Sequence, residues 1–214
     1  QLINASKLSD EDLLEDFLFE SVLEALEACS LLQRSLELIK TKLSSTRDTD
    51  SHVLHLRLID NLIALKQYKE AQEHLSSISE LSFDAENQAR VSFSTGLCSW
   101  YTGNRGKSQV LSHFLQAAKT NPLVAHYFTW IGLYYWRIEG DTERSTKCLM
   151  KALTLDPSDL SCALLLAEIK LKTDNESHVF VVNLLEPFTR ISAQSRSRRL
   201  FYYYGTALFA CKRF

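Results

Sequence analysis

One pattern recurs along this chain at intervals of about 35 residues, and it constrains the fold more than any single motif does. Its clearest copy runs from Ala125 to Asp159 and reads AHYFTWIGLYYWRIEGDTERSTKCLMKALTLDPSD. Apolar residues recur in it at spacings of three and four, which is typical of amphipathic helices. Gly140 and Asp141 interrupt the apolar pattern near its middle. The unit is therefore predicted to be two helices joined by a tight turn.

The side chains of this unit fit two helices that pack closely against each other. Gly132 and Ala152 carry little or no side chain where the two helices approach, and Phe128 and Tyr135 share one face of the first helix. Pro157 ends the unit, because proline cannot continue a helix. The preceding stretch of sequence repeats the scheme with three equivalent residues: Gly96, Ala117 and Pro122.

These units match the tetratricopeptide repeat, a helix–turn–helix unit of about 34 residues that stacks into a right-handed α-solenoid. We therefore expect an all-α fold. The expected repeats span residues 52–88, 89–124, 125–159 and 160–196, and the first helix of a further repeat covers 198–214.

Residues 1–51 are expected to form a separate N-terminal segment. Ser9 and the acidic residues after it are a good helix start, which predicts one helix near residues 10–28 and a second near 30–44. The polar run from Ser44 to Ser51 is the best linker candidate in the chain. Because the chain begins without methionine and ends inside an apolar helical pattern, we expect it to be a fragment of a longer protein.

Composition and motif searches argue against several other classes of protein. The formal net charge of −2 does not favour a dedicated nucleic-acid surface, and no apolar run approaches the ~18 residues of a membrane span. The six histidines do not group with Asp, Glu or Cys at metal-ligand spacings, and no nucleophile motif is apparent. We expect a protein that is not an enzyme and needs no metal or cofactor.

The run Gly103–Ser108, GNRGKS, resembles the end of a phosphate-binding loop but does not complete one. The full motif needs a glycine at position 101, where this chain has Tyr101, and a buried strand ahead of it. The preceding residues instead follow the pattern of a first helix. We therefore interpret Gly103–Ser108 as the turn of a helical hairpin, lengthened by two residues.

The repeat assignment also predicts which side chains face a binding groove. In tetratricopeptide arrays the first helix of each pair lines the inner surface, which here gives a stripe rich in aromatic residues. The candidate partner-binding residues are Phe93, Leu97, Trp100, Tyr101, Thr129, Leu133, Trp136, Arg137 and Tyr202. The same rule places further residues on this surface: Arg90, His126, Ser161, Leu164, Glu168, Leu171, Lys172, Arg199, Thr206 and Phe209.

Two interpretations of this stripe remain open. Its aromatic residues can anchor an extended peptide or a partner helix, with Arg137 orienting a carboxylate or carbonyl group. Alternatively, a tightly wound array packs them against its own neighbouring turn. Residues 196–204, RSRRLFYYY, also mix basic and aromatic side chains as single-stranded nucleic-acid sites do, although part of this run is already assigned to repeat packing.

Within residues 109–159 the chain also resembles one particular family, the tetratricopeptide scaffold subunit of the Superkiller complex. The resemblance rests on His113–Lys119, Gly132–Tyr135, Gly140, Asp141, Arg144, Cys148, Lys151 and Ala152. It implies a cytoplasmic, non-enzymatic scaffold, and we expect a nuclear location as well. In that family the subunit holds an RNA helicase and a WD-repeat subunit together and couples them to the RNA exosome for 3′-to-5′ mRNA decay.

Two other functions fit the same architecture. A peptide-binding adaptor of the co-chaperone or transport type needs a clamp of Lys, Arg and Asn side chains in the groove. A direct RNA-binding repeat protein needs a basic inner surface, and the groove positions supply only scattered cations.

Overall fold

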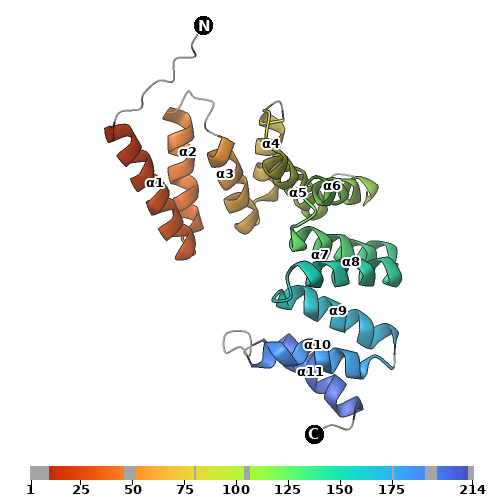
Figure 1. Ribbon diagram of the computed structural model, residues 1–214. Helices are drawn as coiled ribbons and strands as arrows, with labels where there is room; N and C mark the ends of the chain where they lie inside the picture. Colours follow the sequence, from red (N-terminus) through yellow and green to blue (C-terminus); the bar gives the residue numbers. More distant parts are fainter. Residues whose placement is uncertain are drawn as a thin grey trace. The chain divides into compact units, whose positions relative to one another are not determined.

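The computed structural model describes residues 10–45, 52–79, 81–103, 107–174, 176–190 and 197–211, and in these ranges the side chains from residue 18 onward except that of Lys107. All regular elements in these ranges are helical, so the predicted all-α class is confirmed (Figure 1). The helices are α1 (Asp10–Ala28), α2 (Leu32–Ser45), α3 (His52–Ala64), α4 (Tyr68–Ser77), α5 (Ala85–Thr102), α6 (Lys107–Thr120), α7 (Ala125–Tyr134), η2 (Tyr135–Glu139), α8 (Thr142–Leu155), α9 (Leu160–Thr173), α10 (His178–Thr189) and α11 (Arg198–Ala210).

The chain divides into two compact units, Gln1–Phe83 and Asp84–Phe214. The sequence pattern instead placed a boundary at residue 51. The difference arises because α3 packs against α2 within the first unit. Asn61 of α3 donates a buried hydrogen bond of 2.8 Å to Ser35 Oγ of α2, and Arg57 pairs with Glu27 of α1 at 3.6 Å. Residues 46–51 of the expected linker lie outside the described residues.

In the second unit, consecutive helices pack as neighbours from α5 to α11. Short polar side chains fix where these helices begin. The carboxylates of Asp84, Asp141 and Asp159 each accept a hydrogen bond from the backbone N–H three residues later, and Ser197 Oγ does the same for α11. Such caps satisfy N–H groups that have no partner inside the helix. The caps therefore set the repeat register together with the apolar pattern.

Two helical hairpins, α5–α6 and α7–α8, close on a glycine. A Cβ atom added to Gly96 would lie 2.7 Å from the Phe114 ring, and one added to Gly132 would lie 2.8 Å from Leu149 Cγ. Both distances are shorter than side chains tolerate, which confirms that these glycines permit close approach of the paired helices. Ser145 Oγ strengthens the second contact by donating a hydrogen bond of 2.7 Å to the Gly132 carbonyl.

The extra residue ahead of Gly140 is absorbed as one turn of π-helix. α7 continues directly into η2, and Gly140 then ends the helix in the left-handed conformation with φ of +68°. Single π turns accommodate an inserted residue without breaking a helix, and they often lie at functional sites. Trp136 and Arg137 both belong to this turn, so the insertion sets the direction of two predicted groove residues.

The segment that resembles a phosphate-binding loop joins two helices. α5 leads into it and ends at Gly103, which is left-handed with φ of +68°, and Lys107 already belongs to α6. Residues 104–106 of the run lie outside the described residues. Because a helix and not a strand precedes the run, it lacks the structural setting that a phosphate-binding loop requires.

Candidate functional site

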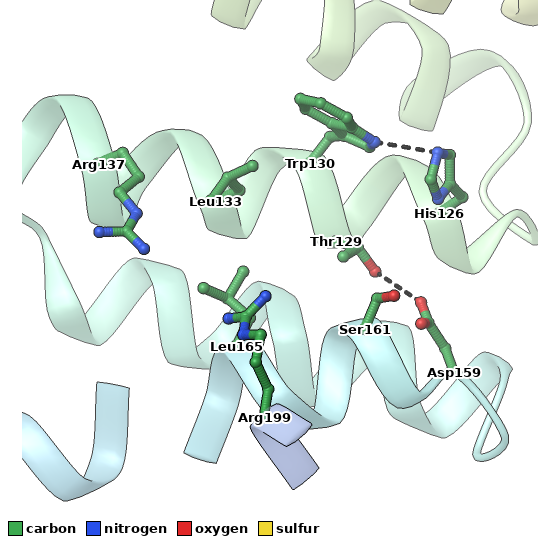
Figure 2. Close-up of a pocket in the computed structure, with 9 residues that line it drawn as sticks. All are labelled: His126, Thr129, Trp130, Leu133, Arg137, Asp159, Ser161, Leu165 and Arg199. Atoms are coloured by element: carbon green, nitrogen blue, oxygen red, sulfur yellow. Dashed lines mark hydrogen bonds between the residues drawn. The ribbon is translucent and has the colours of Figure 1, made fainter. Parts of the chain in front are cut away.

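A cavity of about 350 Å³ lies on the side of the second unit formed by first helices of the repeats. Residues of α7 and η2 form one wall, α9 and its capping residue form another, and α11 contributes one side chain (Figure 2). Its lining residues are His126, Thr129, Trp130, Leu133, Arg137, Asp159, Ser161, Leu165 and Arg199. Three successive repeats therefore build this site together.

One end of the cavity holds hydrogen-bonding groups with fixed roles. Trp130 Nε1 donates to His126 Nε2 at 3.0 Å, so this nitrogen of the histidine is an acceptor (Figure 2). Burial lowers the pKa of His126 although the Asp159 carboxylate opposes that shift, so the ring is neutral near pH 7. Thr129 Oγ1 lies 3.4 Å from Asp159 Oδ2 and donates to it. This end therefore combines a neutral imidazole with one carboxylate.

The other end is organised by a buried carboxylate just outside the cavity lining. Glu168 of α9 is 4% exposed, and its two oxygens meet three cations. Arg137 Nη2 lies 3.1 Å and Lys172 Nζ 2.8 Å from Glu168 Oε1, while Arg199 Nη2 lies 3.4 Å from Oε2. These contacts join η2, α9 and α11, so one carboxylate ties three repeats together at the edge of the cavity.

Two of these cations, Lys172 and Arg137, also control the ionisation of Glu168. Burial by itself raises the pKa of this carboxyl group, because it disfavours the charged form. The hydrogen bond from Lys172 and the charge of Arg137 outweigh burial and hold the pKa below its ordinary value of 4.5. Glu168 is therefore ionised at neutral pH and neutralises one of the three surrounding positive charges.

The structure places three of the candidate partner-binding residues in the cavity, namely Thr129, Leu133 and Arg137. Three more residues of the wider predicted surface also line it: His126, Ser161 and Arg199. It does not place Phe93 and Leu97 on an open surface. Phe93 is 8% exposed and Leu97 is 7% exposed. The Phe93 ring lies 4.9 Å from that of Tyr127 of α7, measured between centroids. Phe93 is therefore covered by the next repeat and Leu97 is buried, so the prediction of both as partner contacts is corrected to packing.

The remaining predicted residues lie outside the cavity lining. The Trp100 ring packs against Trp130 and Tyr134 of α7, with centroids 6.1 and 6.0 Å away. Trp136 packs against a buried cluster from α8 and α9 that includes Leu149 and Leu166. Both tryptophans therefore fill space between helices. The other two aromatic candidates are exposed: Tyr101 is 50% exposed and Tyr202 is 68% exposed.

Comparison with known proteins first finds relatives by sequence. No protein-family model matches the chain. Superkiller complex protein 3 of Mus musculus is 30% identical over 113 residues, or 51% of this chain, and that of Homo sapiens is 29% identical over 110 residues. Tetratricopeptide repeat protein 37 of Xenopus laevis is 29% identical over 116 residues. The matched regions cover only 6–7% of the length of these relatives.

Solved structures resemble the chain over most of its length. A thermophilic tetratricopeptide protein of Thermus thermophilus gives a TM-score of 0.64 at 17% identity, covering 88% of this chain and 96% of its own. YrrB, described as a tetratricopeptide protein with an unusual peptide-binding site, gives 0.54 at 13% identity, covering 91% and 90%. This chain has the tetratricopeptide-repeat fold. Its likeness to the Superkiller scaffold subunit, first noted from residues 109–159, is confirmed over half of the chain.

Within this tetratricopeptide fold, sequence reasoning missed three lining residues of the cavity. Trp130 lies four residues after His126, and Leu165 lies four residues after Ser161, so each shares a helical face with another lining residue. That spacing was a usable signal. Asp159 was assigned to the end of a repeat, but as the cap of α9 it points a carboxylate oxygen towards Thr129.

The tetratricopeptide cavity offers binding groups and no visible catalytic arrangement among the described residues. Within those ranges, no three His, Cys, Asp or Glu side chains are grouped so that they could hold a metal ion. None of the described helices is long and apolar enough to cross a membrane. The cavity presents a short apolar floor. One end of this floor holds a neutral imidazole and a carboxylate, and the other end is cationic.

Proposed function

We propose that this chain is part of a non-catalytic scaffold that assembles other proteins, and that its cavity receives a segment of a partner polypeptide. One observation carries the proposal: the first helices of three successive repeats build a single cavity that holds apolar, polar and charged groups. In binding cavities a few polar groups orient the ligand above an apolar floor. A groove formed by helices can receive a segment of a partner polypeptide in this way. The tetratricopeptide fold supports this function in general, as a helical scaffold for protein interactions.

We further propose that the scaffold acts in the Superkiller complex and so in 3′-to-5′ mRNA decay by the cytoplasmic RNA exosome. The support is the 30% identity to Superkiller complex protein 3 over half of this chain, together with the residues that first suggested the likeness. The proposed partners are an RNA helicase, a WD-repeat subunit and exosome-linked factors. The proposed location is the cytoplasm, with a nuclear pool.

The test is affinity capture of the protein from extract of its own cells, followed by mass spectrometry with quantification of the captured subunits. Recovery of an RNA helicase and a WD-repeat protein in constant proportion across salt washes is the expected result. Recovery of chaperones or transport receptors in their place would leave the scaffold function standing and overturn the decay assignment. Capture from nuclear and cytoplasmic fractions separately tests the proposed location.

A peptide-binding adaptor is the second candidate, and one observation favours it. Arg137 and Arg199 both line the cavity, as the basic part of a carboxylate-binding groove would require, although no asparagine is among the described residues that line it. This function and the decay scaffold differ in the proteins that they hold, so the same capture experiment separates them. Direct RNA binding has less support, because Asp159 places a carboxylate inside the cavity.

A further inference from the structure

The cationic end of the cavity carries more positive charge than its own carboxylate neutralises. Arg137, Lys172 and Arg199 share Glu168 as their carboxylate partner among the described residues, which leaves two positive charges in surplus. The side chains of the three cations are 48%, 56% and 62% exposed, whereas that of Glu168 is 5% exposed. Glu168 therefore holds the cations by ion pairs on their buried side, while their remaining N–H groups face solvent.

The two guanidinium groups have N–H donors that do not contact Glu168. A guanidinium group carries five N–H donors in a rigid fork, and the contacts to Glu168 involve one terminal nitrogen of Arg137 and one of Arg199. An incoming carboxylate can therefore bind both arginines without displacing Glu168. Because each arginine is already held by a buried anion, less conformational freedom is lost when a ligand binds than for a free arginine.

We propose that the cavity binds an acidic segment of a partner polypeptide, in which an apolar side chain lies on Leu133 and Leu165 and neighbouring Asp or Glu side chains reach Arg137 and Arg199. This inference rests on the proposed function of the cavity as a polypeptide site. A surplus of two positive charges matches a pair of acidic side chains better than a single chain-terminal carboxylate. The hydroxyl groups of Thr129 and Ser161 are placed to contact the backbone of the segment.

The layout of the cavity sets the length of the segment. Along the helix that forms one wall, His126 and Arg137 are separated by about 16 Å at a rise of 1.5 Å per residue. An extended peptide covers that span with about five residues, at roughly 3.3 Å each. Figure 2 shows Arg137 and Asp159 at opposite ends of the lining set, so the acidic residues belong at one end of the segment only.

The same layout disfavours a nucleic acid as occupant. A strand carries a negative phosphate at every nucleotide, and its backbone would meet the Asp159 carboxylate at one end of the cavity. A peptide avoids this repulsion because it can carry acids at one end and neutral groups at the other. Single-stranded RNA is therefore the competing ligand in the test.

The test measures fluorescence anisotropy of labelled peptides of about seven residues, all with amidated C-termini, titrated with the full chain. One set places two Asp or Glu residues next to Leu or Phe, and the matched set has Asn or Gln in place of the acids. The acidic set is expected to bind about tenfold more tightly, as for the gain of a hydrogen bond between charged groups. Added salt should lower the affinity of the chain for the acidic peptides and leave its affinity for the neutral peptides unchanged.

Two variants locate the site. Arg199→Gln should lower the affinity for acidic peptides about tenfold, whereas Arg190→Gln should leave that affinity unchanged. Arg190 is a matched control, because it also pairs with a glutamate, Glu186 at 2.8 Å, but does not line the cavity. Thermal melts of both variants show whether they remain folded, and the salt titration of the unaltered chain tests the charge requirement without any variant.

Three outcomes would overturn the inference. If the neutral peptides bind as tightly as the acidic ones, the cavity is a polypeptide site without a charge requirement, and the proposed function survives. If a single-stranded oligoribonucleotide binds more tightly and Arg199→Gln abolishes that binding, the occupant is RNA. If no peptide binds while the helicase and the WD-repeat protein are still captured, the scaffold acts through another surface.

Discussion

Arg137 of η2 and Glu168 of α9 form an ion pair of 3.1 Å between the first helices of two consecutive repeats. Neither residue belongs to the apolar pattern that defines the repeat. Their contact depends on the π turn that carries Arg137 and on the depth at which α9 holds Glu168. Because Arg199 of α11 meets the same carboxylate, the pair is the centre of a connection among three repeats.

Glu168→Gln should destabilise the second unit by about 1.5–3 kcal/mol at pH 7, the range for hydrogen bonds to a charged group. Since the pKa of Glu168 is lowered in the folded chain, its charge contributes stability above the ordinary value of 4.5 and loses that contribution as the pH falls through the folded pKa. Urea unfolding of both chains at pH 7 and pH 3.5 measures the effect. The difference between them should shrink at the lower pH, and a difference independent of pH would contradict this role.

Substitution of glycine by alanine should have opposite effects at different repeats. Gly132→Ala is expected to cost about 1–3 kcal/mol, because the added methyl group would press on buried Leu149 and overpack the hairpin. Gly205→Ala, at the equivalent position of α11, meets nothing within 4 Å and should stabilise the chain by up to about 1 kcal/mol through helix propensity. Thermal melts of the two variants check the signs. Equal destabilisation would show that Gly205 is also covered.

Much of the fold could be predicted because its signals are local. Pro122 and Pro157 mark the ends of two repeats. The helices that follow these prolines begin at Ala125 and Leu160, where the sequence placed the repeat starts. No proline marks the previous boundary, and there α5 begins at Ala85, four residues before the predicted repeat. The Asp84 cap was the missed signal. Class and register therefore follow from short-range chemistry.

The site could be predicted only in part, because burial depends on contacts between repeats. The position rule identifies the face to which Phe93 and Leu97 belong, but not that aromatic residues of α7 cover that face. It placed Glu168 and Arg199 on the inner surface without showing that they meet. That contact needs the spacing of three helices, which no single repeat encodes.

Trp136 distinguishes packing from partner binding. Trp136→Ala should cost about 2–4 kcal/mol, because the ring packs against the cluster of α8 and α9. Trp136→Phe should change stability by less than about 1 kcal/mol, since it keeps an aromatic ring and removes an indole N–H that is buried without a hydrogen-bond partner in the described structure. Chemical unfolding measures both. Weaker partner capture by Trp136→Ala at an unchanged melting temperature would restore the original prediction that Trp136 contacts a partner.

The first unit should lose stability in mildly acidic solution, because of two histidines that face each other. His55 Nδ1 lies 2.9 Å from His74 Nε2, so one nitrogen donates and the other accepts. Burial, the charge of His55 and the charge of Lys40 lower the pKa of His74 to about 4, and burial and His52 lower that of His55. The unfolded chain therefore binds protons more readily than the folded chain between the ordinary pKa of 6.5 and pH 4.

Stability should accordingly fall as the pH drops through that window, by less than about 1.4 kcal/mol per pH unit because water reaches both rings. Native-state hydrogen exchange of α3 and α4 at pH 7 and pH 5 reports on this unit. His74→Gln should remove most of the difference between the two pH values, since the remaining imidazole no longer faces a second one. If the variant retains the full pH dependence, the histidine pair is not its source.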